Sequence, residues 1–320
     1  MGWLSGWKYR KSHKIQGSTA GAVTDYQVRI KVHYGSGTDS GEDVYLNGKC
    51  RTDFGDIRFT KDDGETLLDY WIEEKVDSDY AIFWVKVPNI PASPNTATIY
   101  IYYENSSATS TSNGENTFEF FDDFEDEIID TDKWEEWQTG DFDNYVTEEN
   151  GYLQVDGNTE DWNDHGAKAK NIGLDTDKVW MFRAGKFGSG WGDCDLVWSE
   201  VAAEHREWAG AWLGYYDGGW NSLANVNEGS WKRYEVICKS STEFTVKRDG
   251  ETYSYTRSAL SLPIDVLLGG TIHSNPIARY DWVACRKYVD PEPSHGSWGR
   301  EEHITILPSR IPVRIPARYP

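Results

Sequence analysis

Apolar residues recur at every second position along most of this chain. The run 26–32 (YQVRIKV) places Tyr26, Val28, Ile30 and Val32 on one face and Gln, Arg and Lys on the other. A period of two is the pattern of a β-strand with one buried face. No amphipathic helical pattern of any length is found, and abundant Trp, Tyr and Gly suit sheets better than helices. The chain is therefore predicted to be all-β.

About six alternating runs, separated by turn signals, lie in residues 1–105 and predict a small β-sandwich. Residues 7–15 are expected to form an edge-like first strand. Asp63-Gly64 stands between two runs and signals a hairpin turn. The run 96–103 (TATIYIYY) closes this module.

A polar segment, SSATSTSNGENT at 106–117, marks a boundary because its residues cannot bury enough apolar surface to form a core. The aromatic run FEFFDDF follows at 118–124, and we expect downstream residues to bury it. About ten alternating runs then fill residues 118–302, with Asp249-Gly250 as another hairpin turn. That number of strands fits a two-layered jelly roll, so the second domain is predicted to be a second β-sandwich.

Several motifs of the first module resemble a known family. GWKYRK, DYQV, DIRFTKDDGETLLDYWIE, FWVKVP and TIYIYYENSS read like the domain of unknown function 2341, found in archaeal, bacterial and viral surface proteins. The resemblance covers about residues 3–124, with Glu104 where the family usually has Gly. That family has no assigned chemistry, so the resemblance implies a surface location and no mechanism.

The second module resembles concanavalin A-like (laminin G-like) sandwiches in the order of its motifs: FFDDFED followed by Trp134, then SWKRYEV, TVKRDGE and YDWVACRKYVDPEPS. Relatives of this kind hold a structural ion on loop oxygens. By resemblance, Ca²⁺ would be bound here by Asp123 or Glu125, the carbonyl near Gly157, and Asp281. The alternative is that FFDDFEDE is a solvated acidic turn and Asp281 a cap.

Charge and composition narrow the class of protein. With 53 acidic and 32 basic residues the formal net charge is −21, which argues against nucleic acid as a partner. No apolar run approaches a membrane span, and the N-terminus lacks a secretory signal pattern. We therefore expect no membrane insertion, and an extracellular, cell-surface or virion location after signal removal or release by lysis. The four cysteines show no zinc spacing; buried thiols and a disulfide among Cys194, Cys238 and Cys285 are both open.

Catalysis is a weaker prediction. Glycosidase relatives carry E-x-D-x-x-E on one strand, and the nearest string here is Asp193-Cys194-Asp195 with Trp198 at the position of the last acid. No Ser/His/Asp arrangement and no H-x-x-x-H pair is present, and the seven His residues are scattered. The chain is predicted not to be an enzyme, with a glycoside hydrolase kept as an alternative.

Aromatic residues near Gly and Asp are the better candidates for a binding site, because aromatic rings stack on the apolar faces of sugars. In 209–216, alternation sends Leu213 and Tyr215 one way and Trp212, Gly214 and Tyr216 the other, and one of these faces lines the core. The simpler alternative is that most of these rings are core residues. The candidate ligand-binding residues are Trp162, Trp191, Trp208, Trp212, Tyr216 and Trp220.

Residues 303–320 form a basic, Pro-rich arm with repeated Arg-Ile-Pro, which favours an extended conformation. It lies along its own body or reaches a neighbouring subunit in a homo-oligomer. Taken together, the sequence predicts a non-enzymatic surface or virion adhesin that recognises a glycan through its second sandwich. The alternative is a purely structural subunit of a filament, tail or capsid decoration.

Overall fold

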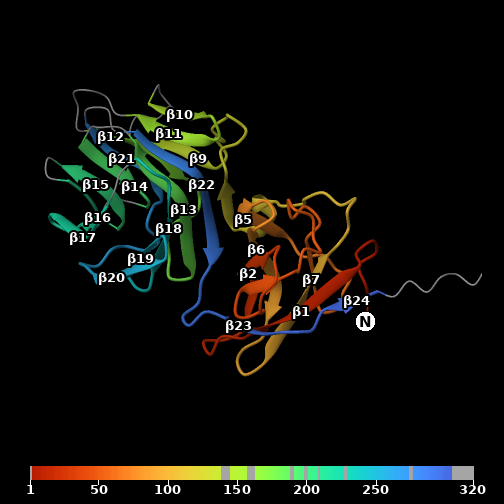
Figure 1. Cartoon of the computed structure of the whole chain (residues 1–320). Coiled ribbons are helices and arrows are strands. Elements are labelled where there is room, and N and C mark those ends of the chain that lie inside the picture. Colours follow the sequence, from red (N-terminus) through yellow and green to blue (C-terminus); the bar gives the residue numbers. More distant parts are fainter. Residues whose placement is uncertain are drawn as a thin grey trace, which may run out of the picture.

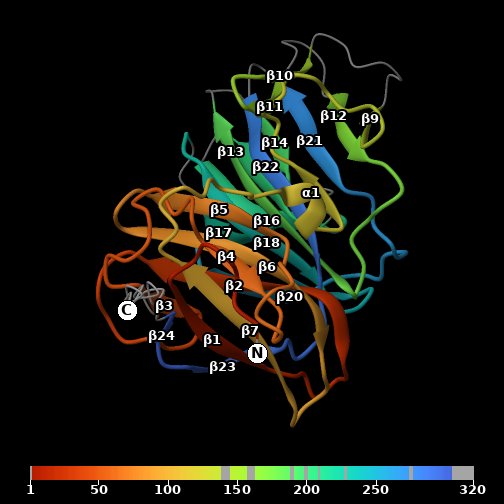
Figure 2. The same cartoon turned by 90° about the vertical axis from the view of Figure 1, so that its right-hand side faces the viewer.

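The computed structural model shows two β-sandwiches side by side (Figures 1 and 2). It describes residues 2–137, 145–156, 163–187, 191–197, 201–207, 210–226, 229–273 and 277–304. Within these ranges the one helix is α1 (Gly114–Thr117), which leads from the first sandwich into the second. The prediction of an all-β chain with two sandwiches is confirmed.

The first sandwich packs a sheet in the order β23-β1-β7-β4, with β24 beside β1, against a sheet in the order β3-β2-β6-β5. Tyr26, Val28, Ile30 and Val32 of β2 are buried in the core between the sheets, as their alternation predicts. The first seven strands are β1 (Tyr9–Gln16), β2 (Val23–His33), β3 (Asp43–Tyr45), β4 (Arg58–Thr60), β5 (Tyr70–Val76), β6 (Tyr80–Ile90) and β7 (Thr96–Tyr103).

The second sandwich is a jelly roll of two packed sheets. One sheet has the order β10-β11-β22-β13-β18-β19-β20, with β8 beside β22, and the other has the order β17-β16-β15-β14-β21-β12-β9. The strands are β8 (Phe120–Asp122), β9 (Trp134–Trp137), β10 (Val146–Glu149), β11 (Tyr152–Asp156), β12 (Asn163–Ala169), β13 (Lys178–Phe187), β14 (Trp191–Asp195), β15 (Ala203–Glu207), β16 (Gly210–Tyr216), β17 (Trp220–Asn225), β18 (Lys232–Cys238), β19 (Glu243–Arg248), β20 (Glu251–Thr256), β21 (Leu267–His273) and β22 (Ile277–Lys287).

After β22 the chain returns to the first sandwich. β23 (Ser294–Trp298) and β24 (Glu302–His303) both pair antiparallel with β1. We call residues 289–304 the return segment. The structure thus differs from the predicted boundary at residue 302, which assigned most of this segment to the second sandwich. The prediction that 7–15 is an edge strand is wrong, because β1 lies between β7 and the return segment.

The polar segment 106–117 lies along the first sandwich. The hydroxyl of Ser112 accepts a hydrogen bond from the backbone N–H of Ile72 at 2.9 Å, and the N–H of Asn113 donates to the Tyr70 carbonyl at 2.8 Å. The N–H of Thr111 donates to the Tyr70 hydroxyl at 3.1 Å. These backbone contacts with β5 hold the segment in a defined path.

A third apolar cluster lies between the two sandwiches. Trp71 of β5 and Trp84 of β6 pack with Phe118, Phe121 and Trp282 from the second module. The Trp71 ring centroid lies 5.0 Å from that of Phe121 and 5.1 Å from that of Trp282. The aromatic run at 118–124 is therefore divided: Phe118 and Phe121 enter this junction, whereas Phe120 and Phe124 enter the core of the second sandwich.

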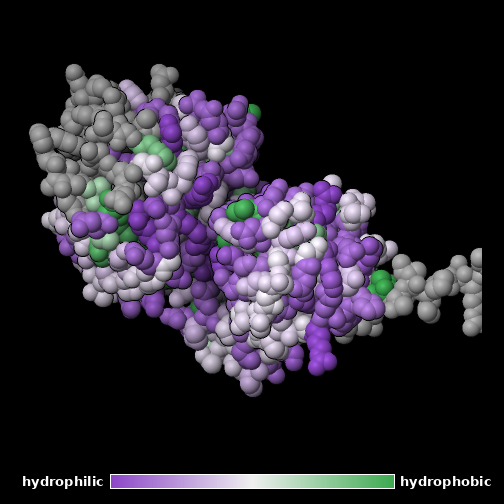
Figure 3. All heavy atoms as spheres, viewed as in Figure 1, coloured by the Kyte–Doolittle hydropathy of each residue, from purple (hydrophilic) through white to green (hydrophobic). Residues whose placement is uncertain are grey.

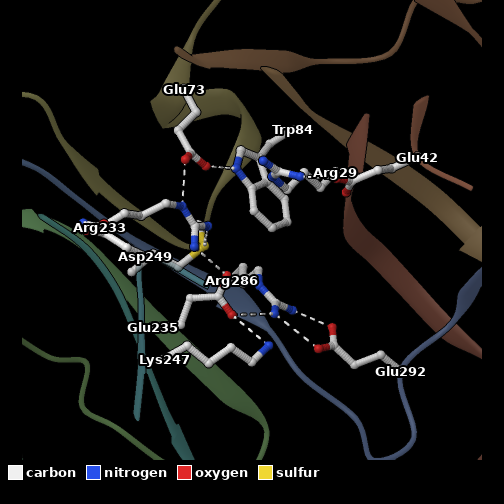
Figure 4. A network of polar contacts seen from close by, with 11 residues as sticks. Arg29, Glu42, Glu73, Trp84, Arg233, Glu235, Lys247, Asp249, Arg286 and Glu292 are labelled. Atoms are coloured by element: carbon white, nitrogen blue, oxygen red, sulfur yellow. Dashed lines mark hydrogen bonds and ion pairs between the residues drawn. The ribbon is translucent and has the colours of Figure 1, made fainter. Parts of the chain in front are cut away.

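Charged side chains surround this apolar junction (Figure 4). Arg233 donates to Glu73 at 2.6 Å and to Glu235 at 2.8 Å, while Arg286 pairs with Glu292 at 2.6 Å and lies 3.7 Å from Glu235. Burial opposes the two guanidinium charges, but the facing carboxylates raise the pKa of Arg233 and of Arg286. Figure 3 shows the resulting hydrophilic seam between the two lobes. The junction joins the sandwiches through both apolar packing and ion pairs.

The four cysteines, Cys50, Cys194, Cys238 and Cys285, are free and buried. Burial is the main cause that raises the pKa of the Cys238 thiol to about 11, so this side chain stays protonated at neutral pH. Of the two alternatives left open by the sequence, the structure shows buried thiols.

Candidate functional site

The seven-stranded sheet of the jelly roll turns one face to the core. Ala167 of β12, Cys194 of β14, Leu213 of β16 and Leu268 of β21 are buried there. Because successive residues of a strand point to opposite sides, the positions between them belong to the other face. We call that second face of the strands β17-β16-β15-β14-β21-β12-β9 the outer sheet face. It carries most of the residues that the sequence selected.

Backbone register aligns a row of polar and aromatic positions across this face. Asn225 of β17 pairs with Trp212, Trp212 pairs with His205 of β15, and His205 pairs with Asp193 of β14. Directly paired residues share a face, with Cβ atoms about 4.5–5.5 Å apart. Four residue types that suit sugar hydroxyls and sugar rings are thereby brought to adjacent positions from four strands.

A row of small residues runs beside the first. Ser222 pairs with Gly214, Gly214 with Ala203, and Ala203 with Asp195. Continuing across the sheet, Gly269 pairs with Asp195 and with Gly166, and Gly166 pairs with Trp137 at the far edge. We call this row the strip of small residues; Gly214, Ala203, Asp195, Gly269 and Gly166 in it are all buried.

Gly214 shows why this strip needs small residues. A Cβ atom at this position would lie 2.6 Å from the ring of Trp220 and 2.3 Å from the carbonyl oxygen of Asn221. The Trp220 ring therefore lies directly against the Gly214 backbone. Tyr216, the backbone partner of Trp220, is half exposed at the same end.

The predicted ligand-binding residues fall into two groups. Trp212, Tyr216 and Trp220 lie on β16 and β17, and Trp191 pairs with His273 at the start of β14. Trp162 and Trp208 lie outside the described residues. The predicted division of 209–216 is confirmed for Leu213 and Tyr215, which pack on the core side.

Asp193 and Asp195 lie two residues apart on β14 and thus share the outer sheet face. Asp195 is 2% exposed, and the hydroxyl of Tyr280 donates to its carbonyl oxygen at 2.6 Å. A carboxylate that attacks or protonates a glycosidic bond must reach the substrate. The burial of Asp195 therefore counts against this pair as a catalytic couple.

The residues proposed for calcium come together only in part. The pKa of Asp123 is raised by desolvation and next by the neighbouring Glu125 carboxylate, so these two acids lie close to each other. Asp281 instead pairs with Arg183 at 2.5 Å, and Gly157 lies outside the described residues. Within the described ranges no three His, Cys, Asp or Glu side chains form a group that could hold a metal ion. The calcium site, which includes the carbonyl near Gly157, stays a prediction.

Glu148 of β10 is an acidic group that sequence reasoning missed. It is 8% exposed, and both of its carboxylate oxygens are buried. Burial, followed by the neighbouring Asp126, raises the pKa of Glu148 to about 8. A Val-Thr-Glu-Glu strand gives no sequence signal for such burial, because solvated sheets carry the same pattern.

Comparisons with known proteins agree with the motifs of the first module. Residues 53–137 match the family described as "Domain of unknown function (DUF2341)". This stretch runs from the DIRF motif through β8 and β9, so it spans the junction between the sandwiches. The resemblance predicted from the sequence is confirmed for these residues. No curated protein matches the chain.

Solved structures with a similar fold are distant in sequence. One, from work titled "Prominent members of the human gut microbiota express endo-acting O-glycanases to initiate mucin breakdown", is 14% identical with a TM-score of 0.40, covering 54% of this chain and 100% of its own. β-Agarase B from Zobellia galactanivorans is 11% identical with a TM-score of 0.38, covering 53% of this chain and 92% of its own. A sialidase is 11% identical with a TM-score of 0.41, covering 83% of this chain and 32% of its own. Likeness of this degree carries no argument about activity.

Proposed function

We propose that the chain is a non-enzymatic surface or virion adhesin that recognises a glycan on the outer sheet face of its second sandwich. The observation that carries the proposal is the cross-strand row of Trp212, His205 and Asp193 beside the strip of small residues. Pyranose rings stack on aromatic faces, and imidazole and carboxylate groups bond sugar hydroxyls.

The extracellular location rests on the same proposal. No helix among the described residues is long and apolar enough to cross a membrane. The net charge of −21 keeps such a protein soluble and repels polyanions, so a neutral or cationic glycan is the expected partner.

Glycan binding can be tested with the full chain on a glycan array, followed by calorimetry with each hit. Trp220→Ala and Tyr216→Ala are expected to weaken binding about tenfold, because each removes an aromatic ring whose stacking contributes about 0.5–1.5 kcal/mol beyond the apolar area that it buries. Trp231→Ala is the matched control, since Trp231 packs against Phe187 and Tyr152 by the other sheet. Equal loss in all three variants, or no hit on any array, would contradict the proposal.

The two alternatives give different results in the same preparation. A glycoside hydrolase would release reducing ends from a bound polysaccharide, and Asp193→Asn would abolish that release while binding persists. A purely structural subunit would bind no glycan and would form a defined oligomer that is lost when residues 303–320 are removed. Both outcomes are measured by reducing-sugar assay and native mass spectrometry.

A further inference from the structure

The return segment is held to the first sandwich by few backbone pairs. β23 has three register pairs with β1, interrupted by a bulge between His13 and Ile15, and β24 has two. Most residues of β23 are half-buried or exposed. Its side-chain contacts therefore decide whether it stays docked.

Two histidines form the central contact. The Nε2 atom of His13 on β1 lies 2.9 Å from the Nδ1 atom of His295 on β23. The His13 ring also stacks on the Trp298 ring with centroids 3.8 Å apart, and the Trp298 Nε1–H donates to the Gly41 carbonyl at 3.0 Å. His13 is fully buried, and its Nδ1 atom has no hydrogen-bond partner in the described structure.

This contact is most stable with both rings neutral, and two imidazolium rings cannot form it. One nitrogen of the His13–His295 bond must donate and the other must accept, so both cannot carry a proton. A proton added to the pair leaves a buried N–H of His13 without an acceptor, which is costly. The Trp298 ring offers an imidazolium partial compensation by its π face. Burial nevertheless lowers the pKa of His13 from 6.5 to about 3, and burial also lowers that of His295.

The charged groups around the pair do not reverse this effect. His13 faces His295 from β23, and its β7 partner Ile99 carries no charge. His295 faces Glu42 and Asp43, which favour its protonation, and Arg29, which opposes it. Both acids already have partners, since Glu42 pairs with Arg29 and Asp43 with His33.

The return segment is also held by ion pairs and hydrogen bonds, among them those of Glu292 with Arg286 and Tyr26. Glu302 pairs with Arg10 at 2.7 Å, and Glu301 accepts from the hydroxyl of Tyr103 at 2.7 Å and pairs with Lys49. Partial burial of Glu301 is outweighed by Lys49 and Tyr103, which lower its pKa. Among these contacts the histidine pair is the one whose burial resists protonation between pH 7 and pH 5.

We propose that the His13–His295 pair is an acid-sensitive catch that releases the return segment from β1 as the pH falls below about 6.5, while both sandwiches stay folded. Protonation favours the released state, in which His295 of the free segment and His13 of β1 are both solvated. Release leaves the edge of β1 unpaired, and an unpaired edge accepts an extended partner strand. The catch thus links the exposure of a sheet edge to acidification.

Hydrogen exchange of the full chain, followed by mass spectrometry from pH 8 to pH 5, tests the catch. After correction for intrinsic exchange, protection of residues 294–298 is expected to fall about 30-fold, the effect of one histidine titrating at 6.5 when free and near 3 when docked. Protection of β18 and β19 is expected to stay unchanged. Protection of 294–298 that does not vary with pH overturns the proposal.

The double variant His13→Gln/His295→Asn replaces the two bonding nitrogens with amide groups that do not titrate. Its protection at 294–298 is expected to be independent of pH, whereas the control His303→Asn is expected to keep the wild-type response. A double variant that still loses protection in acid overturns the proposal. Should the double variant not fold, imidazole NMR of the wild type decides: a His13 ring that protonates near pH 6.5 with β23 still protected also overturns it.

Discussion

The Glu73 carboxylate joins the two sandwiches: one oxygen accepts from Arg233 Nε of the second at 2.6 Å, and the other accepts from Trp84 Nε1 of the first at 2.6 Å. Glu73 belongs to the YWIE motif, whose Trp71 enters the apolar junction cluster. Trp71 and Glu73 therefore face the neighbouring sandwich, whereas Tyr70 and Ile72 pack against the core of the first sandwich. This gives the family motif a structural role in holding the following domain.

Removing one partner of this ion pair is expected to be costly. The Glu73 side chain is 4% exposed and that of Arg233 25%, so Glu73→Ala leaves a largely desolvated guanidinium with Glu235 alone. We expect the free energy of unfolding to fall by about 3 kcal/mol, measured by urea denaturation. Lys75→Ala, which removes an exposed pair with Asp77, is the control and is expected to leave the midpoint unchanged. Equal effects of the two substitutions would contradict this role.

Asp56 of the DIRF motif is expected to be essential for the first sandwich. Its fully buried carboxylate accepts backbone N–H bonds from Arg51 at 2.9 Å, Glu104 at 2.8 Å and Asn105 at 3.1 Å. Asp56→Ala leaves these donors unpaired and is expected to lower the free energy of unfolding by about 3 kcal/mol or more. Asp62→Ala, an exposed neighbour, is expected to stay within about 0.5 kcal/mol. Thermal unfolding of both variants measures the difference.

The raised pKa of Glu148 predicts that the fold loses stability as the pH rises towards about 8. Its pKa is about 8 in the fold against 4.5 in the unfolded chain, so its contribution is full below pH 4.5 and is lost as the pH rises through 8. Glu148→Gln cannot ionise and is expected to be more stable than the wild type at pH 8 by about 2–3 kcal/mol, with the two converging at pH 5. Parallel pH profiles of the midpoint temperature would show that Glu148 is solvated after all.

The calcium prediction also has a direct test. If Asp123, Glu125, the carbonyl near Gly157 and Asp281 bind the ion, calcium at about 100 times its dissociation constant adds about 2.7 kcal/mol and raises the melting temperature by roughly 5–10 °C. Chelator is expected to reverse this rise, and Asp123→Asn to remove it. Asp132→Asn, on the same loop, is the control. A melting temperature that ignores both calcium and chelator rules out the ion.

The turn signal at Asp249-Gly250 was read correctly, whereas Asp63-Gly64 joins two strands of different sheets, and contacts over long distances in the chain were not predicted. Asp249-Gly250 forms the predicted hairpin turn, with φ of 47° and 90° between the paired β19 and β20. Gln27 stands on the predicted polar face of β2 but is buried, because its amide bonds Thr117 and Lys287 of the adjoining module. Alternation with a period of two indicates only which face of a strand is apolar. It does not state that another domain covers the polar face.

The same limit applies to the candidate site. Alternation separated Leu213 from Trp212, but only register showed that Trp212, His205 and Asp193 are neighbours. Likewise, His13 and His295 are far apart in sequence, and neither has a flanking motif that would select it. Such pairs form because strands that are distant in the sequence lie side by side in the fold. A single sequence does not predict which distant strands pair.

The pairing of Tyr9 with His303 has a mechanical consequence. Segments attached ahead of β1 and beyond β24 leave the first sandwich from adjacent points, so tension between them peels β24 from β1 one bonded pair at a time. The jelly roll lies outside that line of force and bears no load. In a chain tethered at both ends, β24 would therefore separate from β1 while the second sandwich stayed folded.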